Sequence, residues 1–439
     1  MKVLKFGGTS VGSAQRMKEV AKLITDGEQK IVVLSAMSGT TNTLVEISDY
    51  LYKKNPEGAN EIINRLEAKY KQHVNELYST DEYKQKTQEF IKAQFDYIRS
   101  YTKDIFTLFE EKVILAQGEL ISTNMVTNYL QEQGVNAILL PALEFMRTDK
   151  NSEPDPVYIK EKLAAQLEIH PDAEIYITQG FICRNAYGEI DNLQRGGSDY
   201  TASLIGAAVN ASEIQIWTDI DGMHDNDPRI VDKTSPVRHL HFEEAAELAY
   251  FGAKILHPTC VQPAKYANIP VRLLNTMEPT APGTLISNDT EKGKIKAVAA
   301  KDNITAIKIK SSRMLLAHGF LRKVFEIFES YQTSIDMICT SEVGVSVSID
   351  NTKHLNEILD DLKKYGTVTV DQDMCIICVV GDLEWENVGF EAKALDAMRD
   401  IPVRMISFGG SNYNLSFLIR EEDKKKALQS LSDHLFNNK

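Results

Sequence analysis

The chain has 439 residues, which is too many for one ordinary hydrophobic core, so two or three domains are expected. Hydrophobic residues make up 43% and charged residues 25%, as in globular proteins, and the net charge of −13 argues against binding to nucleic acid or to an anionic membrane. We expect no signal peptide and no membrane span, because no apolar run is long enough. The five cysteines lie mostly in apolar runs, which indicates a reducing cytoplasm.

The first expected strand leads directly into a glycine turn beside a cation. An apolar strand ends at Phe6, Gly7 and Gly8 follow, and a helix is expected over about 13–26. Glycines let the backbone approach a ligand, the amide groups of such a turn bind anions, and Lys5 adds a full charge. The spacing fits neither a Walker A loop nor a dinucleotide-binding fingerprint. The turn therefore indicates phosphate binding, and a plain tight turn is the alternative.

Strands and helices continue to alternate, which predicts an α/β domain with a largely parallel sheet. A strand over 30–36 ends in a loop of small residues at 35–41, and ligands bind at the carboxyl ends of strands in such sheets. A polar helical stretch follows over about 56–133 and contains Glu119 among small and apolar neighbours. A core-facing Glu is rarely unpaired, so Glu119 either meets a cation or lies exposed on its helix.

The strongest local motif is RGGSDYTA at 195–202, after strands expected over 173–178 and 181–184. Arg195 offers a bidentate fork for a carboxylate or a phosphate. We expect Ser198 to cap the following helix and Asp199 to lie in its first turn, where it stays ionised and can hold a lysine in place. A capping role alone is the alternative for Asp199.

Residues 214–222 are expected to form a strand that runs into a polar turn, and Arg229 in the loop beyond it can reach a phosphate. A helix over 243–251 then leads to Lys254, a second candidate cation on a short turn. His239 and His241 alternate on a strand without convergent Cys or His residues, so a metal site there is not favoured.

From about residue 295 the expected order becomes β-α-β-β-α-β, and it occurs twice. The first repeat covers about 304–372 and includes strands over 304–310, 334–340 and 367–370. The second covers about 373–439, begins with a strand over 375–380 and lacks its last strand. Residues 295–301 can supply that strand, which would interleave the repeats. The expected domains are therefore 1–294 and 295–439.

Cys375 and Cys378 look like half of a zinc or redox motif. They lie in an apolar run typical of a buried strand, and no second Cys or His pair lies nearby in the sequence to complete a tetrahedral site. We expect both to be structural.

Taken together, the motifs resemble those of the aspartokinases. The resemblance covers essentially the whole chain and depends on these blocks in order: KFGGTS at 5–10, VLSA at 33–36, QGE at 117–119, RGGSDYTA at 195–202, WTD at 217–219, DPR at 227–229 and FGAKILHP at 251–258. It implies an amino-acid-kinase α/β/α sandwich with a mainly parallel sheet, followed by two ferredoxin-like βαββαβ ACT domains. In its length and in the motif Thr340-Ser341-Glu342, the chain is most similar to the monofunctional, lysine-sensitive type.

The reaction implied by this resemblance is transfer of the γ-phosphate of ATP to L-aspartate, giving 4-phospho-L-aspartate. Lys5 would neutralise the transferring group and Asp199 would orient Lys5, as phosphoryl transfer requires. Arg195 would bind the α-carboxylate of aspartate, and Glu119 its ammonium. The full aspartate set implied is Ser35, Ala36, Thr41, Glu119, Phe181, Arg195, Gly196, Ser198 and Asp199.

The resemblance also implies a nucleotide site. Its residues would be Lys5, Phe6, Gly7, Gly8, Ser10, Thr218, Asp219, His224, Arg229, Lys254 and Ile255. His224 stands where relatives often carry Tyr. Mg²⁺ would arrive on ATP, so we expect no metal ligand from the protein.

An amino-acid effector, L-lysine, is expected at the first ACT repeat. The residues implied are Met314, Gly319, Phe320, Leu321, Ser334, Ile335, Asp336, Thr340, Ser341 and Glu342. Backbone amides around Gly319 would bind the carboxylate of lysine, and Asp336 and Glu342 would bind its ammonium groups. Leu316 and Ala317 replace the His and Ser common in lysine-inhibited relatives. A homodimer or homotetramer is expected.

Two other functions remain open from the sequence. A kinase of the same superfamily acting on acetylglutamate or glutamate would share the glycine turns, although the tandem ACT tail favours aspartate. A catalytically silent ACT sensor of amino acids would not need Lys5, Asp199 and Glu119 together.

Overall fold

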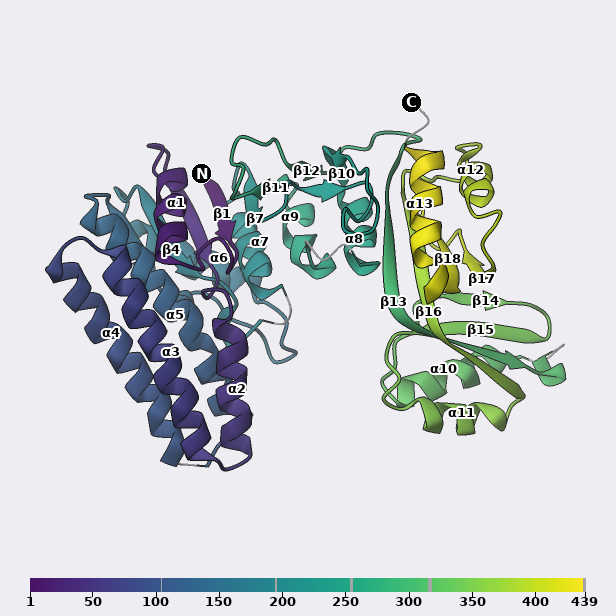
Figure 1. The fold of residues 1–439 in the computed structure, drawn as a ribbon, viewed down its shortest axis with the longest axis horizontal. Helices are drawn as coiled ribbons and strands as arrows, with labels where there is room; N and C mark the ends of the chain where they lie inside the picture. Colours follow the sequence, from purple (N-terminus) through teal and green to yellow (C-terminus); the bar gives the residue numbers. More distant parts are fainter. Residues whose placement is uncertain (104, 194–195, 253–255, 315–317, 437–439) are drawn as a thin grey trace. The chain divides into compact units, whose positions relative to one another are not determined.

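The computed structural model describes residues 1–103, 105–193, 196–252, 256–314 and 318–436. They form two compact units, the first from residues 1–223 and 255–288 and the second from residues 224–254 and 289–439 (Figure 1). Within the described ranges, no helix is long and apolar enough to cross a membrane.

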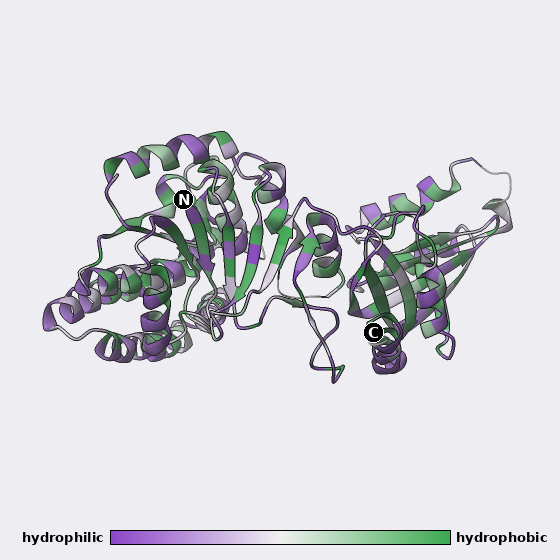
Figure 2. Cartoon of the chain, turned by 90° about the horizontal axis from the view of Figure 1, so that it is seen from above, coloured by the Kyte–Doolittle hydropathy of each residue, from purple (hydrophilic) through white to green (hydrophobic). Residues whose placement is uncertain are grey.

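The first unit is built on a mostly parallel sheet with the strand order β12-β11-β7-β1-β2-β4-β3. Its strands are β1 (Lys2–Phe6), β2 (Lys30–Leu34), β3 (Ala137–Leu140), β4 (Ile175–Gln179), β7 (Ile214–Thr218), β11 (Val271–Asn275) and β12 (Thr284–Ser287). All neighbouring pairs are parallel except β11 and β12. Figure 2 shows that hydrophobic residues are frequent along these strands, as expected for a sheet covered on both faces.

Helices pack on this sheet as two groups. The first group shares one hydrophobic core with β1, β2 and β4 and consists of α1 (Ala14–Ile24), α2 (Thr40–Tyr52), α3 (Pro56–Leu77), α4 (Asp81–Ser100) and α5 (Leu108–Glu132). The second consists of α6 (Pro156–Ile169), α7 (Gly197–Ala208) and α9 (Gln262–Tyr266), with α7 packed on β1, β2 and β7. A hairpin of β5 (Ile182–Arg184) and β6 (Ile190–Asn192) lies between α6 and α7 in the chain.

Parallel pairing aligns the carboxyl ends of the central strands. Phe6 at the end of β1 is opposite Leu34 of β2 on one side and Trp217 of β7 on the other. The segments that follow these strands therefore begin at the same edge of the sheet, where ligands bind in open α/β folds.

The second unit contains an antiparallel sheet with the order β14-β15-β13-β16-β18-β17. Its strands are β13 (Ile295–Lys310), β14 (Ile338–Thr340), β15 (Gly344–Ile349), β16 (Thr367–Gly381), β17 (Val403–Ser407) and β18 (Asn414–Arg420). Its helices are α8 (Phe242–Tyr250), α10 (Phe320–Ser330), α11 (Leu355–Lys363), α12 (Phe390–Ala397) and α13 (Lys424–Leu435). Short strands β8 (Met223–His224), β9 (Pro236–Val237) and β10 (His239–His241) precede α8.

Two long strands run through both halves of this second unit. Residues 304–310 of β13 pair with β15 and with the start of β16, whereas residues 295–301 pair with the end of β16. Ile307 and Ile309 belong to a core with α10 and α11, and Val298 belongs to a separate core with α12 and α13. Helix α8 packs on β13 and β16. The domain boundary at residue 294 stays a prediction.

Two local predictions are wrong. Helix α7 begins at Gly197 after Gly196, whose φ is +74°, so Ser198 is already helical and does not cap the helix. A strand was expected over 334–340, but β14 covers only Ile338–Thr340. The amide of Met337 donates to the Ser348 hydroxyl at 2.9 Å, while the amide of Asp336 and the carbonyl of Met337 both bond to the backbone of Ser348, so the pairing is irregular there.

Candidate active site

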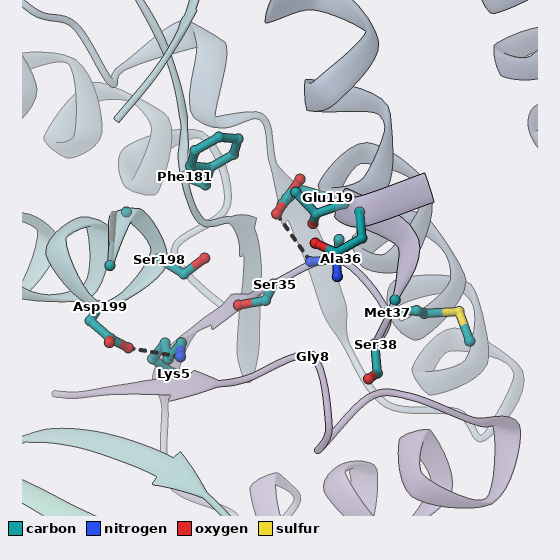
Figure 3. A pocket seen from close by; sticks show the side chains of 15 residues that line it. Lys5, Gly8, Ser35, Ala36, Met37, Ser38, Glu119, Phe181, Ser198 and Asp199 are labelled. Carbon is teal, nitrogen blue, oxygen red and sulfur yellow. Dashed lines mark hydrogen bonds and ion pairs between the residues drawn. The ribbon is translucent and has the colours of Figure 1, made fainter. Parts of the chain in front are cut away.

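A pocket of about 390 Å³ opens at the carboxyl edge of the first unit's sheet (Figure 3). It is formed by segments that follow β1, β2 and β4, by α5 and by the start of α7. Its lining residues are Lys5, Gly8, Ser35, Ala36, Met37, Ser38, Gly39, Thr41, Asn42, Glu119, Phe181, Gly196, Gly197, Ser198 and Asp199.

One cation and one carboxylate meet in this pocket. The Nζ atom of Lys5, near the end of β1, lies 2.7 Å from Oδ1 of Asp199 in the first turn of α7. Their side chains are only 11% and 12% exposed, so the ion pair is largely shielded from water. Asp199 thereby fixes the position of the ammonium group, while the surrounding low dielectric strengthens its effect on an anion.

Glycine packing brings the two loops of the pocket together. A Cβ atom on Gly8 would lie 2.8 Å from the carbonyl oxygen of Ala36, and the amide of Ser38 donates to the Gly8 carbonyl at 3.0 Å. A side chain at Gly8 would separate these loops. The glycine after Lys5 is therefore needed for the close packing of the two loops, in addition to the approach of a ligand to the backbone.

Glu119 reaches the pocket from the middle of α5. A Cβ atom on Gly118 would lie 2.7 Å from Cβ of Ala36, so glycine allows this close approach. Oε1 of Glu119 accepts a hydrogen bond from the amide of Ala36 at 3.2 Å, and Oε2 has no hydrogen-bond partner in the described structure. Burial raises the pKa of Glu119 to about 8. The free oxygen is suited to a ligand that brings a positive charge.

The pocket contains every described residue of the predicted aspartate set. Besides Glu119 and Asp199, these are Ser35, Ala36, Thr41, Phe181, Gly196 and Ser198. Arg195 lies outside the described residues. Met37, Ser38, Gly39, Asn42 and Gly197 also line the pocket but were not predicted, although the small-residue loop at 35–41 and the glycine pair at 196–197 indicated their surroundings.

The predicted nucleotide residues are less closely grouped. Phe6 is buried and stacks on Trp217 with ring centroids 5.6 Å apart, and the hydroxyl of Ser10 is 2.7 Å from that of Thr276. Gly7 lies close to Lys5, because a Cβ atom there would be 3.6 Å from Nζ. Thr218 ends β7 and Asp219 follows it exposed. Among the predicted nucleotide residues that the structure describes, only Lys5 and Gly8 line the pocket itself.

Four further nucleotide predictions involve the second unit or the parts that are not described. Arg229 is 77% exposed and pairs with Asp227 at 2.7 Å, and Nδ1 of His224 is 2.9 Å from the hydroxyl of Thr234. Lys254 and Ile255 lie outside the described residues.

The predicted effector residues lie near the start of α10 and near β14. Gly319, with a φ of +81°, precedes α10, which begins at Phe320 as expected. Met314 is partly buried, as is Ile335, whereas Leu321, Ser334, Thr340, Ser341 and Glu342 are exposed. Oδ1 of Asp336 is 2.7 Å from both Nζ of Lys301 and the hydroxyl of Tyr250. Leu316 and Ala317 lie outside the described residues.

Comparison with known proteins identifies the family of the chain. Residues 1–275 match the amino acid kinase family, and residues 377–435 match an ACT domain. The fold and site thus define an amino acid kinase with an ACT-type regulatory region, as the sequence predicted.

Relatives narrow the class further. The chain is 35% identical to chloroplastic aspartokinase 1 of Arabidopsis thaliana, over 99% of this chain and 80% of that protein. A structure of E. coli aspartokinase III with aspartate and ADP has a TM-score of 0.85 at 32% identity, covering 99% of this chain and all of that one. The structure of that enzyme with lysine and aspartate has a TM-score of 0.82 at 33% identity, covering 99% of each chain. The chain belongs to the aspartokinase family.

Proposed function

We propose that this chain transfers the γ-phosphate of ATP to the β-carboxylate of L-aspartate. The observation that best supports this reaction is the combination of the Lys5–Asp199 ion pair with buried Glu119 in one pocket. Aspartate and ADP are bound together in the related E. coli enzyme.

Each charged residue has a role that follows from its surroundings. The unpartnered oxygen of Glu119 accepts the α-ammonium group of aspartate, and the amide of Ala36 holds the other oxygen at 3.2 Å. The attacking β-carboxylate is ionised at neutral pH, so no general base is needed. Lys5 stabilises the negative charge that develops on the transferring oxygens, and Asp199 keeps the lysine in place at 2.7 Å.

The nucleotide site has donors suited to phosphate. The ammonium group of Lys5 and the glycine turn at Gly7 and Gly8 are typical of anion binding. Mg²⁺ bound to ATP would neutralise phosphate charge, and most of its ligands would be phosphate oxygens and water.

The chain's regulation and cellular role are part of the same proposal. We infer feedback inhibition by L-lysine, which is supported by the lysine complex of E. coli aspartokinase III. The product would enter lysine, diaminopimelate, threonine and methionine synthesis in the cytoplasm. Complementation of an aspartokinase-deficient strain tests the biosynthetic role, and failure to complement would contradict it. Cell fractionation tests the cytoplasmic location, and a membrane-bound location would contradict it.

We also propose a homodimer or homotetramer. Trp385, Val388 and Phe408 of the second unit are 76%, 93% and 40% exposed, and apolar surface of this kind is typical of contacts between subunits. Light scattering at micromolar concentration tests the proposal, and a fully active monomer would contradict it.

The kinase proposal is tested by ADP release with Mg-ATP and aspartate, acetylglutamate or glutamate. We expect turnover with aspartate, and we expect Lys5→Ala to lower kcat at least about 100-fold while changing the KM for ATP much less. Lys2→Ala is the matched control, because Lys2 lies on the same strand with a 39% exposed side chain. Preference for acetylglutamate, or unchanged kcat in Lys5→Ala, would refute the assignment.

A further inference from the structure

Phe181 occupies an unusual turn in the wall of the pocket (Figure 3). The amide of Ile182 donates to the carbonyl of Gly180 at 2.8 Å, which closes a three-residue turn, and Phe181 at its centre has a φ of +69°. A central residue with positive φ is rare in such turns, and it is strained for a bulky side chain. The surroundings must therefore supply free energy to hold this conformation.

Hydrogen bonds fix both backbone groups of Phe181. Its amide donates to Oγ1 of Thr201 at 3.0 Å, and its carbonyl accepts from the amide of Leu193 at 2.7 Å. The Thr201 hydroxyl in turn donates to the carbonyl of Gly197 at 2.8 Å, so its only proton is already used. Thr201 is fully buried, so its hydroxyl is held away from bulk water between these two partners.

Close packing then joins this turn to the first turn of α7. A Cβ atom on Gly180 would lie 2.5 Å from Oγ of Ser198, and one on Gly197 would lie 2.7 Å from a ring carbon of Phe181. Ser198 lines the pocket beside Asp199, the partner of Lys5. A shift of the turn would therefore change the shape of the pocket on the side that Phe181 and Ser198 form.

We propose that Thr201 is a positioning residue for the acceptor substrate and that it acts by holding Phe181 in its strained turn. Thr201 is not among the residues that line the pocket, so its effect passes through the backbone of Phe181. The inference rests on the proposed function, in which the pocket binds aspartate. Loss of the hydroxyl would leave the partly buried amide of Phe181 without its acceptor, and the turn would relax.

The test compares three variants of the full chain. Thr201→Val keeps the side-chain shape and removes the hydroxyl, whereas Thr201→Ser keeps the hydroxyl. Thr127→Val is the matched control, because buried Thr127 makes the same helical bond to the carbonyl of Thr123 at 2.8 Å and is not among the residues that line the pocket. Steady-state kinetics and calorimetric titration with aspartate provide the readouts.

We expect Thr201→Val to raise the aspartate KM and dissociation constant about tenfold, with kcat and the KM for ATP within about threefold of the parent. The aspartate KM and dissociation constant of Thr201→Ser should stay within about twofold of the parent. Those of Thr127→Val should do the same, even if both valine variants melt at a lower temperature. Parental aspartate KM in Thr201→Val, or an equal rise in Thr127→Val, would overturn the inference.

The activity of the parent chain separates this inference from the proposal that it rests on, and a further variant covers a failure to fold. If the parent does not phosphorylate aspartate, the proposed function fails, whatever the variants do. If Thr201→Val does not fold, Thr201→Cys keeps a weak acceptor at the same place, and it should give an intermediate rise in aspartate KM. A folded Thr201→Cys variant with parental KM would then refute the role of Thr201.

Discussion

Glu119 shows how one buried side chain can link proton binding, stability and ligand binding. One of its oxygens accepts the Ala36 amide, the other has no partner in the described structure, and burial raises its pKa to about 8 from an ordinary value of 4.5. Between these two values the folded protein binds more protons at this site than the unfolded chain. The stability that Glu119 contributes therefore falls as pH rises from about 4.5 to about 8.

Glu119→Gln should remove this dependence, because an amide does not titrate. We expect the melting temperature of the ligand-free variant to rise relative to the parent as pH increases from 5 to 8. Calorimetric melting at pH 5, 6.5 and 8 measures the difference, and Glu61→Gln, at an exposed position, serves as the control. A difference that stays constant over this range would mean that Glu119 titrates as an ordinary carboxyl group.

At the residue scale, chemistry was easier to predict than backbone geometry. Lys5 was predicted from the glycine turn beside it, Asp199 from its place in the first turn of a helix, and Glu119 from its small and apolar neighbours. All three line one pocket. The strained turn at Phe181 could not be predicted, because propensity disfavours positive φ for an aromatic residue. Ser198 was mistaken for a cap because Gly196, with its free backbone, starts the helix earlier.

At the scale of elements, Lys301 connects three segments of the second unit. Its Nζ atom, on β13, lies 2.7 Å from Asp336 and 2.9 Å from Asp350, and it lies 4.4 Å from the ring centroid of Tyr250 at the end of α8. Burial alone would lower the pKa of Lys301, but the two carboxylates outweigh it and raise the pKa. The side chain of Asp336 is only 1% exposed, so it depends on this ammonium group.

Lys301→Met should therefore destabilise the protein by about 3 kcal/mol, because it leaves a buried carboxylate without its cation. Urea unfolding followed by circular dichroism measures the loss. Lys308→Met, at an exposed position of the same strand, should change the free energy of unfolding by less than about 0.5 kcal/mol. Equal stability of the two variants would show that the Lys301 ion pairs contribute nothing net.

The elements of the second unit were largely predictable, but their continuity was not. Strands were expected separately at 295–301 and 304–310, and again at 367–370 and 375–380. The structure joins each pair into one strand, β13 and β16, with register shifts near Lys301 and Ile304. Sequence periodicity breaks at such irregularities, whereas the backbone continues through them, so local patterns cannot distinguish a bulge from a loop.

For the whole molecule, an effector must compete with contacts that already exist. Asp336 is engaged by Lys301 and Tyr250, while Glu342 is exposed and available. We expect millimolar L-lysine to raise the apparent aspartate KM or to lower kcat, and Glu342→Ala to relieve the inhibition. Initial rates with lysine, threonine and methionine, singly and in pairs, measure this. Glu329→Ala, exposed on α10, is the control, and inhibition by threonine alone would refute the lysine proposal.

The long strands β13 and β16 also affect the order in which the chain can fold as it is synthesised. The start of β13 emerges before the whole first repeat, yet its partners from Ile376 to Gly381 emerge only after it. Until then, the apolar residues Ala297, Val298 and Ala299 lack the strand that covers their backbone in the finished protein. A ribosome paused within this interval would hold an unpaired, aggregation-prone strand, which makes translation speed between these segments a determinant of folding yield.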